Sequence, residues 1–135
     1  MTSPKILIVD DKPDTLKLLG IRLETEGYPY YITASDGDEA LEKIREESPD
    51  LVLLDADMPR KNGFEVLLEM KRDPQTANIP AIMISAVRVD LQDIQRGLGL
   101  GAGNYLTKPF EWRELAKRIR LSLDKSKPSL TCNLQ

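Results

Sequence analysis

The chain has 135 residues, a net charge of −3 and 41% hydrophobic residues, a balance typical of one globular domain with a full core. It has no histidine, which excludes most hydrolytic triads and zinc sites, and its single cysteine excludes an internal disulfide. The acidic balance gives no overall attraction to nucleic acid. No apolar run approaches the ~18 residues of a membrane span, and the first residues lack the apolar core of a signal peptide. We therefore expect a cytoplasmic protein that makes no contact with membranes.

Five short apolar runs alternate with five stretches of helical periodicity. The runs predict buried strands at residues 5–9, 30–34, 51–54, 81–84 and 104–106. The helices between and after them have these predicted inner residues: Leu16, Leu19 and Leu23; Ala40, Leu41 and Ile44; Phe64, Leu67 and Leu68; Leu91, Ile94 and Leu98; Trp112, Leu115 and Ile119. Either Ser35 or Asp36 is a suitable cap for the second helix.

This unbroken alternation predicts an α/β fold, a flavodoxin-like, doubly wound parallel sheet of five strands and five helices. The expected strand order is 2-1-3-4-5. Residues 1–124 would form the domain, and residues 125–135, which show no periodicity, would form a flexible tail or the stub of a linker.

Polar side chains follow four of the five predicted strands. Asp10 and Asp11 follow the first strand, Asp55 the third, Ser85 the fourth and Lys108 the fifth. Singly, each has a plainer explanation as a helix cap, a loop hydroxyl or a solvated charge. Ligands of open parallel sheets bind beyond the carboxyl ends of the strands, where the strand order reverses. We therefore expect all five side chains to converge on one site.

Three carboxylates in one pocket repel one another unless a cation joins them. Without histidine or a thiolate pair, the expected cation is Mg²⁺, or Mn²⁺ in its place. Lys108 supplies a mobile positive charge and Ser85 a hydroxyl, and both suit a phosphoryl group. A carboxylate nucleophile beside these groups is the equipment for an aspartyl-phosphate.

Four segments make the chain similar to a known family. Residues 6–11 (ILIVDD), 51–63 (LVLLDADMPRKNG), 79–86 (IPAIMISA) and 101–110 (GAGNYLTKPF) resemble the receiver domain of two-component response regulators. The resemblance covers residues 5–123, nearly the whole chain. It implies a signalling module rather than an enzyme. Such a module passes a signal by accepting and losing a phosphoryl group.

The resemblance also implies a role for each site residue. Asp55 would accept phosphate from a sensor histidine kinase or a phosphotransfer protein, and Asp11, Asp55 and the carbonyl of Asp57 would bind Mg²⁺, with Asp10 assisting through water. Lys108, Ser85 and Ala86 would bind the phosphoryl group, and the peptide bond from Lys108 to Pro109 would be cis. Ser85 and Tyr105 would be the switch pair.

The resemblance further implies that phosphorylation alters the face made by the fourth helix, the fifth strand and the fifth helix. A downstream protein would bind this face, or two copies of the chain would dimerise through it. The fourth helix carries Gly97 and Gly99 inside its apolar pattern, with Gly101 near its end, which predicts a weakly held element. The basic residues of the last helix predict a solvated face or a dimer contact rather than a nucleic-acid patch: Arg113, Lys117, Arg118 and Arg120.

The alternative to a signalling module is a phosphatase of the haloacid dehalogenase type. Its DxD motif resembles Asp55-Ala56-Asp57, so Asp55 would be the nucleophile and Asp57 the general acid. In such enzymes the paired acids follow the motif, whereas here Asp10 and Asp11 precede it. The order of the acidic residues therefore favours the signalling module.

Overall fold

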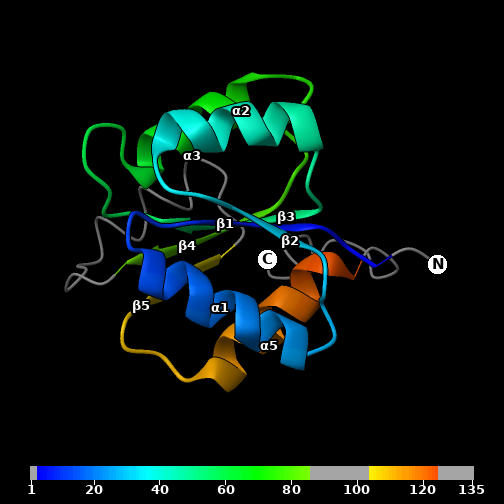
Figure 1. Ribbon diagram of the computed structural model, residues 1–135. Coiled ribbons are helices and arrows are strands. Elements are labelled where there is room, and N and C mark those ends of the chain that lie inside the picture. Colours follow the sequence, from blue (N-terminus) through cyan, green and yellow to red (C-terminus); the bar gives the residue numbers. More distant parts are fainter. Residues whose placement is uncertain (1–2, 86–103, 125–135) are drawn as a thin grey trace, which may run out of the picture.

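A five-stranded parallel sheet with helices on both faces forms the computed structural model, which describes residues 3–85 and 104–124 (Figure 1). The strands are β1 (Ile6–Val9), β2 (Tyr31–Ala34), β3 (Leu51–Asp55), β4 (Ala81–Ser85) and β5 (Asn104–Thr107). The described helices are α1 (Pro13–Thr25), α2 (Gly37–Glu47), α3 (Gly63–Arg72) and α5 (Trp112–Leu123).

The strands lie in the order β2-β1-β3-β4-β5, as the sequence predicted. Ile6 is in register with Leu51 across β1 and β3, and Val52 is in register with Ala81 across β3 and β4. The order of connections reverses between β1 and β3, which are neighbours in the sheet. The carboxyl ends of these two strands therefore form the edge at which a ligand site of this fold is expected.

Each face of the sheet has its own core, because successive side chains of a strand point to opposite faces. Leu7 and Val9 pack with α2 and α3, whereas Ile6 and Ile8 pack with α1 and α5. Figure 1 shows the same division, with α2 and α3 over one face and α1 and α5 over the other. β1 is buried on both faces, which explains why its sequence is continuously apolar.

All five predicted strands and four of the five predicted helices are confirmed. Asp36, rather than Ser35, caps α2, since its Oδ1 accepts a hydrogen bond from the backbone N–H of Glu39 at 2.8 Å. Leu68 was predicted to face the core and is only half-buried. Val66 and Met70 are buried instead, because α3 packs against α2 as well as the sheet, and its buried stripe is turned away from Leu68.

Some predictions concern parts of the chain outside the described residues. They are the fourth helix with Gly97, Gly99 and Gly101, the phosphate-binding role of Ala86, and the tail at residues 125–135. None of the four described helices combines the length and the apolar character that a membrane crossing requires.

The start of α3 lies unusually close to the end of β3. Asn62 and Glu65 form a capping box, in which each side chain accepts a hydrogen bond from the other's backbone N–H. A Cβ atom added to Gly63 would stand 2.4 Å from the backbone oxygen of Asp55. Glycine at this position therefore lets the helix approach the strand end that carries Asp55.

Candidate functional site

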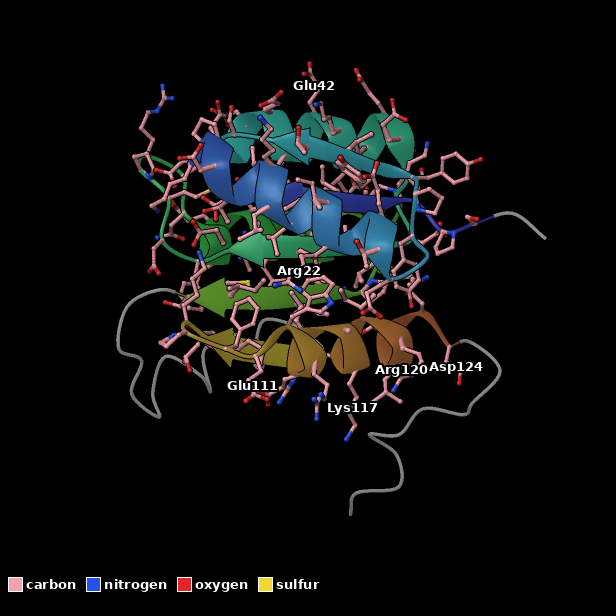
Figure 2. The ribbon with its side chains drawn as sticks, turned by 60° about the horizontal axis from the view of Figure 1, so that its bottom comes forward. Arg22, Glu42, Glu111, Lys117, Arg120 and Asp124 are labelled. Carbon is pink, nitrogen blue, oxygen red and sulfur yellow. The ribbon has the colours of Figure 1, made fainter. Side chains whose placement is uncertain are left out.

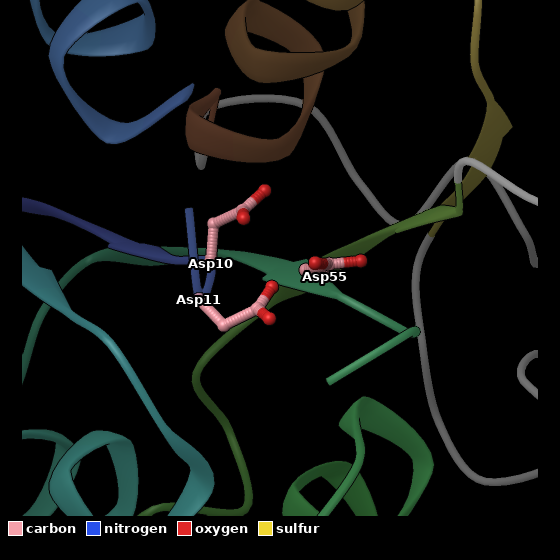
Figure 3. A group of neighbouring side chains, drawn as sticks. All are labelled: Asp10, Asp11 and Asp55. Carbon is pink, nitrogen blue, oxygen red and sulfur yellow. The ribbon is translucent and has the colours of Figure 1, made fainter. Parts of the chain in front are cut away.

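Three carboxylates meet at the carboxyl ends of β1 and β3. One oxygen from each of Asp10, Asp11 and Asp55 lies within 4.8 Å of the other two (Figure 3). In Figure 3 the side chain of Asp10 is directed toward the α1 and α5 side, and that of Asp11 toward the α2 and α3 side. The predicted convergence of these residues is confirmed. A set of carboxylate oxygens without nitrogen or sulfur suits a hard divalent cation.

Asp55 is buried, and only one of its two carboxylate oxygens accepts a hydrogen bond from the described residues. It is 2% exposed, and its Oδ1 accepts a hydrogen bond of 2.9 Å from the backbone N–H of Asp57. Its Oδ2 is buried and has no hydrogen-bond partner among the residues that the structure describes. Burial raises the pKa of Asp55, and the charge of Asp10 adds to the effect, although the N–H of Asp57 and the charge of Lys108 oppose it. Such an oxygen is suited to bind a cation or to form a covalent bond.

Asp10 links the first strand to the fifth. Its Oδ1 accepts a hydrogen bond of 2.8 Å from the backbone N–H of Lys12, and its Oδ2 lies 3.5 Å from Nζ of Lys108. Lys108 also donates its backbone N–H to the carbonyl of Ser85 at 2.6 Å, which fixes the start of the loop after β5. The peptide bond from Lys108 to Pro109 is cis, as the resemblance implied.

Ser85 lies at the same edge of the sheet, but its hydroxyl is hydrogen-bonded to Asp57 and not to Asp55. Its Oγ donates a hydrogen bond of 2.7 Å to Oδ2 of Asp57. Tyr105, the other predicted switch residue, is half-buried, and its ring stacks on Phe64 with 6.2 Å between the ring centroids. β4 and β5 are paired, so the two residues belong to adjacent strands.

One cation near the cluster was missed by the sequence analysis. Nζ of Lys12 lies 3.5 Å from Oδ1 of Asp11. The negative charge of Asp11, followed by that of Asp10, raises the pKa of Lys12. Its position directly after two aspartates was the signal that could have identified it. Lys12 partly neutralises the cluster from the solvent side.

An apolar groove, here called the α1 groove, opens beside the carboxylates. Asp10, Asp55 and Lys108 contribute to its lining, and its volume is about 410 Å³. Its other walls come from α1 and from the segment that leads into α5, including Leu18, Leu19, Arg22, Pro109, Phe110 and Trp112. The side chain of Arg22 extends from α1 toward α5 (Figure 2), and its guanidinium carbon is 5.9 Å from the centre of the Trp112 ring. The sequence analysis did not predict this groove.

The arrangement combines two chemical capacities. The carboxylates of Asp10, Asp11 and Asp55 can hold a divalent cation, and the ammonium of Lys108 can pair with an anion beside it. Oδ2 of Asp55, which accepts no hydrogen bond from the described part of the chain, then lies where it can attack an electrophile such as phosphorus.

The sequence matches a family described as "Response regulator receiver domain" over residues 6–120. One curated relative is the alkaline phosphatase synthesis transcriptional regulatory protein PhoP of Bacillus subtilis, 42% identical over 122 residues. The match covers 90% of this chain and 49% of that protein. The chain spans about half the length of the curated relatives it matches.

Solved structures agree with this match. The Vibrio cholerae chemotaxis protein CheY4 superposes with a TM-score of 0.83 at 30% identity, over 90% of this chain and 100% of that one. A CheY-like response regulator receiver domain protein from Methanospirillum hungatei gives a TM-score of 0.84 at 31% identity, over 92% and 96%. The chain belongs to the response regulator receiver domain family of two-component signal transduction.

Proposed function

We propose that Asp55 is the phosphoacceptor of this receiver domain and that its phosphorylation switches the protein between two states. The observation that carries the proposal is the buried Oδ2 of Asp55, which has no hydrogen-bond partner within residues 3–85 and 104–124 and lies beside two other carboxylates and Lys108. A structural carboxylate of the core would have both oxygens satisfied, because an unpaired buried polar atom is costly. The free-energy cost of leaving this oxygen unpaired is explained if it binds a cation and forms the bond to phosphorus.

The site residues would divide the chemistry between them. Asp11 and Asp55, with the carbonyl of Asp57 and the water-mediated help of Asp10, would hold Mg²⁺ or Mn²⁺, which would neutralise the charge of the carboxylates and the incoming phosphoryl oxygens. An Oδ atom of Asp55 forms the new bond to phosphorus, and the bond from phosphorus to the donor nitrogen or oxygen breaks. Lys108, which is 3.5 Å from Asp10 here, would pair with a phosphoryl oxygen.

The switch would begin at Ser85. Its hydroxyl would leave Asp57 and donate to the phosphoryl group, with the backbone of Ala86 as a further donor. The space that Ser85 vacates would let the ring of Tyr105 move farther inward from its stack on Phe64. Phosphorylation would thereby favour one arrangement of β5 and the neighbouring helical face, a population shift between two existing states.

The donor would be a sensor histidine kinase or a phosphotransfer protein, and the receiver itself would catalyse the transfer and the later loss of phosphate. The output would be a protein bound at the face of the fourth helix, β5 and α5, with a homodimer through that face as the other option. On α5, Lys117 and Arg120 are exposed (Figure 2), as is Arg113, whereas Arg118 pairs with Glu114 at 3.2 Å. The cytoplasmic location expected from the sequence remains part of this proposal.

Relatives such as PhoP are named transcriptional regulators, and this chain covers about half of their length. Binding of nucleic acid is therefore not assigned to the receiver domain itself. The alternative of a haloacid dehalogenase phosphatase is not supported, since the chain matches the receiver family over residues 6–120. The carboxylate of Asp57, the general acid of that alternative, is engaged by the hydroxyl of Ser85.

Treatment with acetyl phosphate and MgCl₂, followed by intact-mass measurement, tests the proposal. The wild-type chain should gain the mass of one phosphoryl group, and the gain should disappear with EDTA and in Asp55→Asn. Asp50→Asn is the matched control, since Asp50 lies at the opposite end of β3, where it accepts a hydrogen bond from the backbone N–H of Lys5. Undiminished labelling of Asp55→Asn would contradict the assignment.

A further inference from the structure

We infer that the α1 groove selects small phosphoryl donors whose leaving group carries a short apolar body, as in butanoyl phosphate. The inference rests on the proposed function, because the groove and the phosphoacceptor share Asp55 and Lys108. It adds a preference among donors that the carboxylate cluster alone does not provide.

The groove extends away from the phosphoacceptor along α1. Its lining includes Asp55 and Lys108 at one end, and Arg22 and Trp112 at the other. Thr15 and Arg22, which both line it, are seven positions apart on α1 and therefore about 10 Å apart along the helix axis. The volume of about 410 Å³ is within the usual range of small-molecule sites. A donor held at Asp55 thus has room for a leaving group beside α1.

The charges of the groove fit a molecule with an anionic head and an apolar tail. Lys108 and the cation site face the head, where the phosphoryl oxygens carry the negative charge. Leu18, Pro109 and Phe110 provide apolar surface next to that end. Leu18 is 57% exposed, so a tail that covers it removes apolar surface of both molecules from water.

The transfer of the phosphoryl group to Asp55 requires no reactant other than the donor. An Oδ atom of Asp55 forms a bond to phosphorus, while the bond between phosphorus and the acyl oxygen breaks. The acyl carboxylate leaves with both electrons of that bond, and no proton has to move. A longer acyl chain changes the reacting bond very little, so a strong dependence of the rate on chain length would report contact with the groove.

The experiment compares acetyl, propanoyl and butanoyl phosphate at equal, subsaturating concentrations with MgCl₂, and follows the phosphorylated fraction by intact mass. Phosphoramidate, whose leaving group has no carbon, provides the reference rate for every variant. The labelling rate should rise about threefold per added methylene, or about tenfold from acetyl to butanoyl, somewhat below the full transfer value of a methylene group.

Two substitutions on α1 separate the groove from general surface effects. Leu18→Ser removes an apolar wall, and Ile21→Ser removes an apolar side chain of similar exposure that does not line the groove. The ratio of butanoyl to acetyl rates, each divided by the phosphoramidate rate of the same variant, should fall about threefold in Leu18→Ser. The same ratio should stay at its wild-type value in Ile21→Ser.

If phosphoramidate labels the wild-type protein but the labelling rate stays constant or falls from acetyl to butanoyl phosphate, this inference alone is overturned. The groove would then be assigned to the side chain of a protein donor. Equal effects of Leu18→Ser and Ile21→Ser on the ratio would overturn it as well. Absence of labelling by phosphoramidate would instead contradict the phosphoacceptor assignment, and the groove preference would fall with it.

Discussion

Ser85 donates its hydroxyl hydrogen to the carboxylate of Asp57, 28 positions earlier in the sequence, with 2.7 Å between Oγ and Oδ2. The bond joins the end of β4 to the loop after β3. In the proposed mechanism this hydroxyl has to move to the phosphoryl group on Asp55. Asp57 would therefore compete with phosphate for Ser85 and would stabilise the unphosphorylated state.

Asp57→Ala should increase the affinity for beryllofluoride, a mimic of the phosphoryl group. Loss of the competing hydrogen bond should make binding more favourable by roughly 1 kcal/mol, which lowers Kd about fivefold. The effect is modest because a hydrogen bond to an exposed carboxylate contributes less free energy than one to a buried charged group. The affinity is measured by fluorescence titration in the presence of MgCl₂. In a Ser85→Ala background the same substitution should have little effect, and equal gains in both backgrounds would remove Ser85 from the explanation.

Mg²⁺ should stabilise the wild-type protein against thermal unfolding. Binding to the folded state alone adds about 2.7 kcal/mol when the ligand is at a hundredfold excess over Kd. Asp11→Ala removes one carboxylate of the cluster and should reduce the rise in Tm to a small fraction of the wild-type value. Asp14→Ala, an exposed substitution in the first turn of α1, should keep the full rise. Equal responses of Asp11→Ala and wild type would place the cation elsewhere.

The raised pKa of Asp55 predicts a pH dependence of stability in metal-free protein. Between the ordinary pKa of an aspartate and the raised value, the folded state binds more protons than the unfolded state, so the free energy of unfolding falls as the pH rises. Asp55→Asn removes this term. In EDTA the variant should be more stable than wild type at pH 7, and the difference should shrink as the pH falls toward 4. Denaturant titrations across this range measure it, and a difference that is constant with pH would contradict the burial of a charged Asp55.

Gly63→Ala should destabilise the protein by about 2 kcal/mol and slow the phosphorylation of Asp55. Its Cβ would stand 2.4 Å from the backbone oxygen of Asp55, so the strand end or α3 has to shift. Gly20→Ala is the matched control on α1. Its Cβ would meet the end of the Tyr31 ring at 2.5 Å, and a side chain can move aside more easily than a backbone. If both variants lose equal stability and label at equal rates, the backbone contact at Gly63 has no special role.

The sheet could be predicted from the sequence because its three central strands, β1, β3 and β4, are buried on both faces and so read as apolar runs. The meeting of Asp10, Asp11 and Asp55 followed from the same reasoning, since residues that follow adjacent parallel strands must share an edge. Leu68 was placed wrongly because helical spacing alone does not show that α3 packs against a second helix.

The details of the site could not be predicted in the same way. The bond from Ser85 to Asp57 and the pair of Lys108 with Asp10 depend on side-chain rotamers and on distances of a few ångströms. The α1 groove depends on how far α5 stands from α1, which no residue of either helix specifies alone. Local sequence determines which strand end a residue follows, whereas the packed structure determines which atom it faces.

Hydroxylamine mapping of the phosphorylated chain identifies the residue that carries the phosphoryl group. The protein is labelled with acetyl phosphate and MgCl₂, treated with hydroxylamine, digested and examined by tandem mass spectrometry. An acyl phosphate on Asp55 is converted to a hydroxamate, so a single modified residue at position 55 is predicted, without modification of Asp10, Asp11 or Asp57. A hydroxamate at one of those aspartates instead, or a label that resists hydroxylamine, would contradict the account.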